Sequence, residues 1–167
     1  MESKARAAGH AIHPMLIAFP LGLLGMAVIF DIIYLVTGTA GWTTVSFWMI
    51  AAGVVSGLVA AVPGLIDWLL IVPPQTRAWY IGLYHGVGNV IIVVLFAVSW
   101  YLRKGHGTGY AMAGPPDTAA LVCSFLGLVL AVLTGWLGGE LVERLNIAVH
   151  EGANPDAPSS LSQRPPV

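Results

Sequence analysis

The sequence predicts an all-α integral membrane protein, a four-helix bundle with up-down-up-down topology. Of its 167 residues 57% are hydrophobic and only 9% are charged, whereas soluble domains carry about 25% charged residues. The mean hydropathy is +0.81. Four apolar stretches, Met15–Val36, Val45–Val72, Ala78–Leu102 and Thr118–Leu141, are each long enough for the roughly 20-residue helix that crosses a bilayer.

The first apolar stretch follows a polar and basic segment, residues 1–12, which contains Lys4 and Arg6. We interpret the stretch as a spanning helix and not as a signal peptide. It is longer than the apolar region of a signal peptide, and no small-residue cleavage site follows it. Pro14 suits the start of this helix, where its missing N–H has no helical partner.

The second stretch is longer than one span requires, which predicts a tilted helix or a bend at Pro63. Pro73 and Pro74 mark its end. The third stretch carries no formal charge and contains His85, with Asn89 one helical turn further on. An ionisable side chain inside a membrane span usually faces other protein and serves a function.

The segments between and after the last two spans have a different composition. Residues 103–117 are rich in Gly and Pro and predict an extramembrane loop. The tail, residues 151–167, has little to bury and predicts disorder. We therefore expect a polar N-terminal segment (1–12), one four-span domain (13–150) and a disordered tail, with no evident sequence repeat.

The distribution of Lys and Arg outside the spans predicts the orientation. The terminal side has five such residues and the other side has two: Lys4, Arg6, Arg77, Arg144 and Arg164 against Arg103 and Lys104. The positive-inside rule then places both termini in the cytoplasm, so we expect a multi-pass protein of the inner cell membrane. The net charge of −1 gives no reason to expect nucleic acid as a partner.

Stripes of small residues predict which helix faces meet inside the bundle. In the second span the stripe ends on an acidic residue: Gly53, Gly57, Ala60, Gly64 and Asp67. In the third span His85 and Asn89 continue a stripe that begins with Ala78 and Gly82. We therefore predict that Asp67 and His85 both point into the bundle and face each other.

Four ionisable residues, one from each span, lie toward the terminal side: His13, Asp67, His85 and Glu140. They could form one polar layer of two imidazoles and two carboxylates. Asp31 lies about 20 Å further along the first span. It belongs near the opposite membrane face, and we interpret it as structural.

Several of these residues lie in motifs that resemble the DUF2231 family of predicted bacterial membrane proteins. The motifs are HPMLIAFPLGLLGMAVIFD, PGLIDW, GLYHGVGN and GWLGGELV, in that order, between His13 and about Val149. The resemblance implies a four-span membrane protein without an assigned function. Some relatives are fused to Rieske-type domains, which implies an electron-transfer setting. This chain has only Cys123, and a Rieske centre needs two Cys and two His.

The first functional hypothesis is a b-type haem held between His13 and His85. Gly82, Gly86 and Gly88 would leave room for a flat macrocycle. The chain has no C-x-x-C-H attachment motif, so the haem would be bound noncovalently. Such a protein would transfer electrons without being a catalyst in its own right, and it would need a redox protein as partner.

The alternative hypotheses use the same residues differently. His13, Asp67, His85 and Glu140 could bind zinc or iron, or relay protons in transport, with Asn89 orienting His85. The polar residues could also be purely structural, in a small non-catalytic subunit of a membrane complex or in a homo-oligomer built on GxxxG contacts. We find no catalytic motif of a soluble enzyme, phosphate loop or dinucleotide fingerprint.

Overall fold

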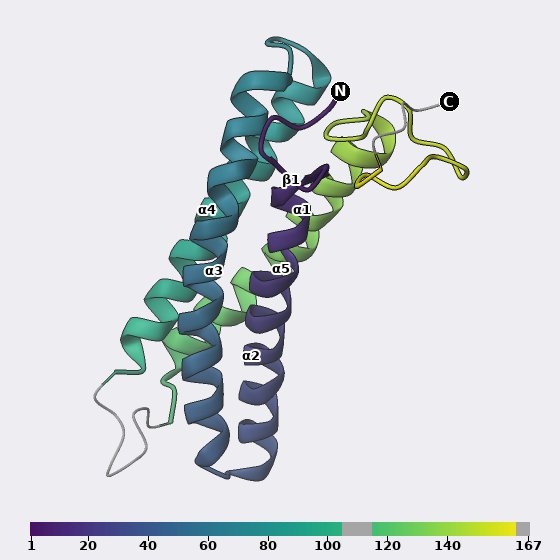
Figure 1. Ribbon diagram of the computed structural model, residues 1–167. Coiled ribbons are helices and arrows are strands. Elements are labelled where there is room, and N and C mark those ends of the chain that lie inside the picture. Colours follow the sequence, from purple (N-terminus) through teal and green to yellow (C-terminus); the bar gives the residue numbers. More distant parts are fainter. Residues whose placement is uncertain (105–114, 163–167) are drawn as a thin grey trace.

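The protein is a long helical bundle with both termini at one end (Figure 1). The computed structural model describes residues 1–104 and 115–162, so most of the expected loop and the end of the tail, with Arg164, lie outside the described residues. The elements in chain order are β1 (Arg6–Ala7), β2 (His10–Ala11), α1 (Ile12–Leu16), α2 (Ala18–Thr37), α3 (Gly41–Ile71), α4 (Arg77–Leu102), α5 (Thr118–Gly139) and the π-helical turn η1 (Glu140–Arg144).

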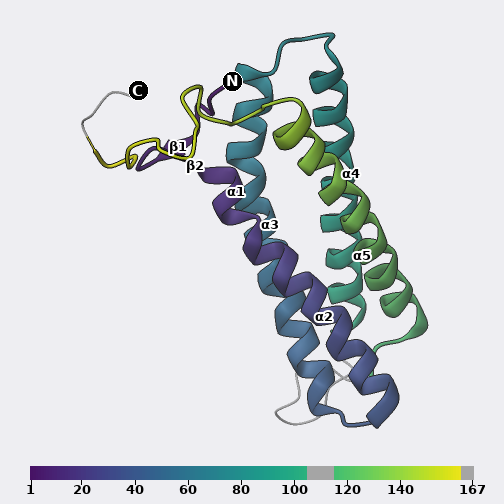
Figure 2. The same ribbon diagram turned by 90° about the vertical axis from the view of Figure 1, so that its right-hand side faces the viewer.

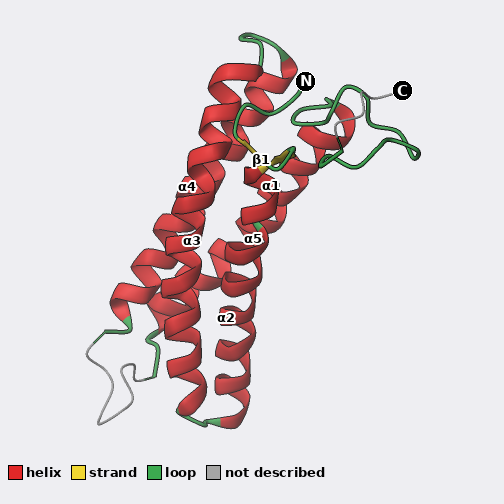
Figure 3. Cartoon of the chain, in the orientation of Figure 1, coloured by secondary structure: helices red, strands yellow, loops and turns green. Residues whose placement is uncertain are grey.

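Within the described residues four helices are long and apolar enough to cross a membrane, which confirms the predicted fold class. The spans are Ile12–Thr37, Gly41–Ile71, Arg77–Leu102 and Thr118–Arg144. Their ends differ from those of the predicted stretches by no more than four residues, and the second span ends one residue before the predicted Val72. Large apolar side chains along the outside of all four helices are exposed, as expected for a surface that faces lipid. Helix dominates the chain, and the only strands among the described residues form a short antiparallel pair at the terminal end (Figure 3).

Prolines shape the first two spans differently. The first span is interrupted at Ile17, between α1 and α2. Pro20 has no N–H to donate to the carbonyl of Leu16 and its ring crowds that turn, which accounts for the interruption. By contrast α3 continues through Pro63 as one 31-residue helix.

The bundle consists of two antiparallel hairpins packed side by side. One hairpin is α1 and α2 with α3, and the other is α4 with α5 (Figure 2). Their shared core contains Leu24, Val28, Ile50, Ile92 and Phe96, which come from α2, α3 and α4. Because lipid supplies no hydrophobic drive between helices, close packing and internal polar contacts must hold the two hairpins together.

The N-terminal segment is hydrogen-bonded to the terminal end of the bundle. Asp67, near the end of α3, is buried, and its carboxylate accepts hydrogen bonds from the Ser3 hydroxyl at 2.6 Å and from the backbone N–H groups of Lys4 at 2.8 Å and Ala5 at 3.2 Å. The N-terminal amine also donates to the carbonyl of Asn146 at 2.9 Å. The polar segment before the first span is therefore anchored to the bundle.

Replacing Asp67 with Ala should release this segment. The loss of two backbone N–H bonds and one hydroxyl bond to a carboxylate, each worth about 1.5–3 kcal/mol when the acceptor is charged, should speed tryptic cleavage after Lys4 about 10-fold or more. Glu140→Ala, which removes a carboxylate at the same end, is the control. Equal cleavage rates in both variants would show that Asp67 does not anchor the segment.

The direction of insertion stays a prediction. Arg103, counted above as an extramembrane charge, is in fact buried, so only Lys104 remains on the non-terminal side and the predicted bias increases. In a Cys123→Ala background, Thr39→Cys should react with a membrane-impermeant maleimide in intact cells, and Ser159→Cys should react only after lysis. Both positions are exposed and lie at opposite ends of the bundle. The reverse labelling pattern would overturn the predicted orientation.

Candidate functional site

The two imidazoles of the terminal-side layer lie next to each other inside the bundle. His13 comes from α1 and His85 from α4, so one ring belongs to each hairpin. Their ring centroids are 6.3 Å apart and the ring planes are nearly perpendicular, at 86°. A metal atom bound between two imidazole nitrogens, with bonds of about 2.0–2.1 Å, separates the centroids by roughly 6 Å.

Each imidazole is oriented by a backbone carbonyl on the second helix of its own hairpin. His13 Nδ1 lies 2.8 Å from the carbonyl oxygen of Ala60, and His85 Nδ1 lies 2.8 Å from that of Thr134. A carbonyl oxygen only accepts, so Nδ1 carries the proton in both neutral rings and Nε2 keeps its lone pair. In metal-binding histidines the ring nitrogen that does not bind the metal usually donates its N–H to such an acceptor, which fixes the orientation of the ring.

Glycines make the space that the rings occupy. A Cβ added at Gly64 would lie 2.8 Å from His13 Nδ1, and one added at Gly138 would lie 3.1 Å from His85 Cε1. Each glycine lies four residues after the carbonyl that holds the ring. A side chain at either position would push the imidazole away from that carbonyl.

The two carboxylates predicted to join the imidazoles have other partners. Asp67 holds the N-terminal segment, as described above, and Glu140 forms a 2.7 Å ion pair with the exposed Arg77. Neither Asp67 nor His85 has the other as a hydrogen-bond partner among the described residues, contrary to the predicted pairing. The described parts of the chain bring no three His, Cys, Asp or Glu side chains together in a way that could hold a metal ion.

Asn89 lies beside His85, as its spacing predicts. Its Nδ2 donates to the His85 carbonyl at 2.8 Å and lies 3.2 Å from His85 Nε2. Because Nδ1 carries the proton, Nε2 accepts this second bond. His85 is therefore oriented at both ring nitrogens, and a ligand bound at Nε2 would replace Asn89 there.

Only one of the three glycines expected to make room for a macrocycle is open. A Cβ at Gly82 would meet Trp68 at 2.5 Å, and one at Gly88 would meet the Thr134 methyl at 2.4 Å, whereas Gly86 has nothing within 4 Å. The space beside Gly82 and Gly88 is therefore filled by side chains.

A second polar cluster, at the other end of the bundle, was not recognised as one site from the sequence. Arg103 forms a two-pronged ion pair with Asp31, at 2.7 and 2.6 Å, and both side chains are almost fully buried. The remaining guanidinium N–H groups donate to Ser46, Ser99 and Ser124 at 3.0–3.2 Å. The cluster joins α2, α3, α4 and α5, and all five guanidinium donors have an acceptor.

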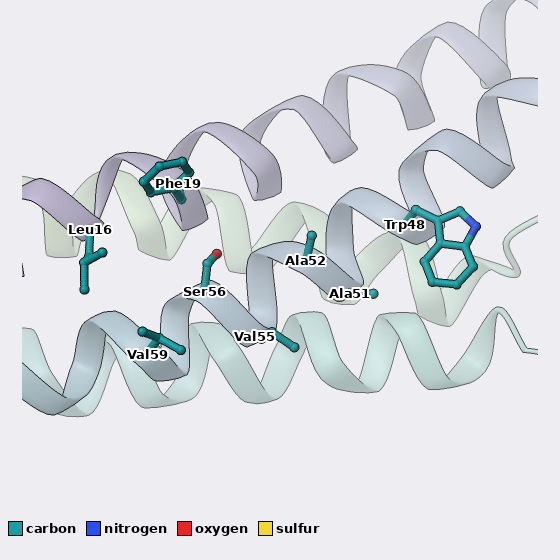
Figure 4. Close-up of a pocket in the computed structure, with 8 residues that line it drawn as sticks. All are labelled: Leu16, Phe19, Trp48, Ala51, Ala52, Val55, Ser56 and Val59. Carbon is teal, nitrogen blue, oxygen red and sulfur yellow. The ribbon is translucent and has the colours of Figure 1, made fainter.

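An apolar groove of about 560 Å³ lies on the outside of the first hairpin (Figure 4). It is lined by Leu16, Phe19, Trp48, Ala51, Ala52, Val55, Ser56 and Val59. None of the charged or imidazole side chains lines it, and its single hydroxyl supplies no chemistry. We assign it to the lipid-facing surface.

Comparison with known proteins identifies one family. The family model described as "Predicted membrane protein (DUF2231)" matches residues 9–151, which include His13, His85 and the buried pair of Asp31 and Arg103. No curated protein and no solved structure matches the chain. The match agrees with the resemblance seen in the sequence motifs and with the four spans, and it assigns no activity.

Proposed function

We propose that this chain, which belongs to the DUF2231 family of predicted membrane proteins, holds a b-type haem between His13 and His85 and serves electron transfer in the membrane. The observation that supports this proposal is the imidazole pair, 6.3 Å between centroids, with each Nδ1 held by a carbonyl. Two donors and no third are what a haem needs from a protein in order to be six-coordinate.

The number of ligands favours haem over a bare ion. A structural zinc ion takes four protein ligands and a catalytic one usually takes three. The carboxylates that could complete such a set, Asp67 and Glu140, are engaged by the N-terminal segment and by Arg77. A haem brings four equatorial nitrogens of its own and requires only an axial pair, which two imidazoles supply.

The residues of the chain would contribute orientation and a dry environment. The carbonyls of Ala60 and Thr134 hold the two rings and raise the basicity of each Nε2 by accepting from Nδ1–H. Both rings are only partly exposed, and limited access of water would favour the less charged state of a redox centre. The bound haem would supply one-electron chemistry, with a potential set by this axial pair and its surroundings.

The filled space beside Gly82 and Gly88 favours a second candidate, in which the same imidazoles bind a metal ion or a proton for transport. Edge-to-face packing of two aromatic rings also gives centroid distances of 4.5–7 Å. In this case no macrocycle separates the rings, and a metal ion or proton at His85 Nε2 would still replace the contact with Asn89.

The visible spectrum of the detergent-purified protein, expressed with ample haem, distinguishes these candidates. The haem proposal expects a Soret band, a shift on reduction with dithionite, and about one haem per chain. A colourless protein would end the haem proposal. Metal analysis of the same sample would then support the second candidate if zinc or iron is stoichiometric, and a blank result would leave a structural role for the pair.

A further inference from the structure

The two imidazoles make the same kind of contact with a backbone carbonyl, which indicates that the two hairpins are structurally equivalent. In each hairpin a histidine near the start of the first helix contacts, through Nδ1 and at 2.8 Å, a carbonyl of the second helix. His85 follows His13 by 72 positions, and Thr134 follows Ala60 by 74. The second offset is two residues larger than the first. The second hairpin therefore has two more residues than the first between its histidine and the carbonyl that the histidine contacts.

The same offsets recur at the other contacts between the paired helices. Gly64 and Gly138, whose missing side chains make room for the two rings, are 74 positions apart. In the core, a Cβ at Gly53 would meet Leu24 at 2.5 Å, and one at Gly127 would meet Phe96 at 2.7 Å. The large residues are again 72 apart and the glycines 74 apart.

The buried ion pair obeys the same relation. Arg103 follows Asp31 by 72 positions, so the two partners occupy equivalent places, each 18 residues after the histidine of its own hairpin. They meet each other across the bundle at 2.6 Å, as the two histidines do at 6.3 Å between centroids. A residue can meet its own equivalent only on or beside a twofold axis.

We propose that the chain is made of two equivalent hairpins related by a pseudo-twofold axis along the bundle, and that His13 and His85 are matched ligands of one group on that axis, positioned by Gly64 and Gly138. The ligand part of this proposal rests on the proposed function. The equivalence of the hairpins does not, because it follows from contacts within the protein.

The direction of the axis follows from the two pairs of equivalent residues that contact each other, the histidine pair and the ion pair. The histidine pair and the ion pair are separated by 18 residues, or about 27 Å of helix at 1.5 Å per residue. Both pairs lie across the axis, so the axis runs parallel to the helices and along the membrane normal, as in other membrane proteins with parallel repeats. A group bound at the histidine end is therefore approached in the same way from both halves.

The equivalence of the hairpins also indicates different roles for the histidine pair and for the Asp31–Arg103 pair. At one end both hairpins present the same side chain, an imidazole whose Nε2 could bind a ligand, in His85 by replacing its contact with Asn89. At the other end the equivalent positions have diverged into a carboxylate and a guanidinium, which satisfy each other and leave no donor for a ligand. The first end is a binding site, and the second holds the halves together.

Matched glycine variants test the positioning part. Gly64→Ala and Gly138→Ala should each lower the haem retained per protein roughly 10-fold, the range seen when the residues behind metal ligands are changed, with little change in thermal midpoint. Gly25→Ala and Gly135→Ala, where a Cβ meets nothing within 4 Å, should retain haem as the unmutated protein does. A loss confined to one of Gly64 and Gly138 would overturn the matched assignment.

An exchange of the ion pair tests the equivalence without any cofactor. Asp31→Arg and Arg103→Asp should each reduce the yield of monodisperse protein more than 10-fold. The double exchange should restore part of it, because the two charges pair again, although the serines that hold the Arg103 guanidinium have no hydroxyl-bearing equivalents. A double variant no better than the worse single variant would overturn the duplication. If the exchange restores folding and the unmutated protein binds no haem, the proposed function fails while the duplication stands.

Discussion

Replacing Arg103 with Met should destabilise the bundle by about 3–5 kcal/mol, the cost of leaving a buried charge without its partner. Asp31 is fully buried and accepts from Arg103 through both carboxylate oxygens. Without the guanidinium, the carboxylate must be protonated or left unpaired in a low-dielectric interior. Thermal unfolding in detergent, followed by the loss of monodisperse protein, measures the change.

The matching double variant separates the cost of an unpaired charge from the value of the pair itself. Asp31→Leu with Arg103→Met removes both charges and should regain most of the lost stability, because buried pairs replaced by apolar residues are often neutral. The hydroxyls of Ser99 and Ser124 keep an acceptor in the carbonyl of Ala120.

A surface pair provides the control for this experiment. Arg77→Met breaks the Arg77–Glu140 pair at the other end, whose arginine side chain is 63% exposed, and should cost less than about 1 kcal/mol. If Arg103→Met costs no more than Arg77→Met, the buried pair does not hold the hairpins together.

Replacing either His13 or His85 with Ala should abolish haem binding while leaving the bundle folded. In the proposed binding mode each imidazole would supply one of two ligands to the iron, so loss of either would remove half of the protein's hold on it. The carbonyls of Ala60 and Thr134 lie in helices and keep their helical partners, so neither variant leaves a serious unpaired group. Haem content and the Soret band, compared with the thermal midpoint, separate lost ligation from lost folding.

Two further variants sharpen the result for the histidines. His10→Ala removes an exposed imidazole whose Nε2 lies 3.1 Å from the Ser160 hydroxyl, and it should leave haem content unchanged. His85→Met should retain haem at a higher reduction potential, because thioether ligation raises the potential. Full haem retention in His85→Ala would show that the ligand lies elsewhere.

Much of the architecture could be predicted from composition and spacing because the bilayer imposes simple requirements. A span must be about 20 apolar residues long, and the four spans follow. The small-residue stripe of the second span correctly predicted that Asp67 is buried, since small residues mark close helix approach. The positions of His13 and His85 toward the terminal side of their helices suggested a shared layer, although His85 lies several residues deeper along its span than His13 does.

The polar partners could not be predicted in the same way. Asp67 binds the N-terminal segment because a short polar chain folds back onto the bundle, and no periodic pattern signals such a contact. Arg103 was assigned to a loop because it follows the last apolar residue, yet its long side chain reaches back to Asp31. The available signal was the shared 18-residue spacing from His13 to Asp31 and from His85 to Arg103.

The most direct test of the histidine pair as axial ligands is the low-temperature electron paramagnetic resonance spectrum of the oxidised, haem-loaded protein. Imidazole planes at 86° predict the strongly anisotropic low-spin ferric signal that perpendicular axial imidazoles produce, and its loss in both His13→Ala and His85→Ala. A high-spin signal in the unmutated protein, or a low-spin signal that survives in either variant, would contradict the assignment.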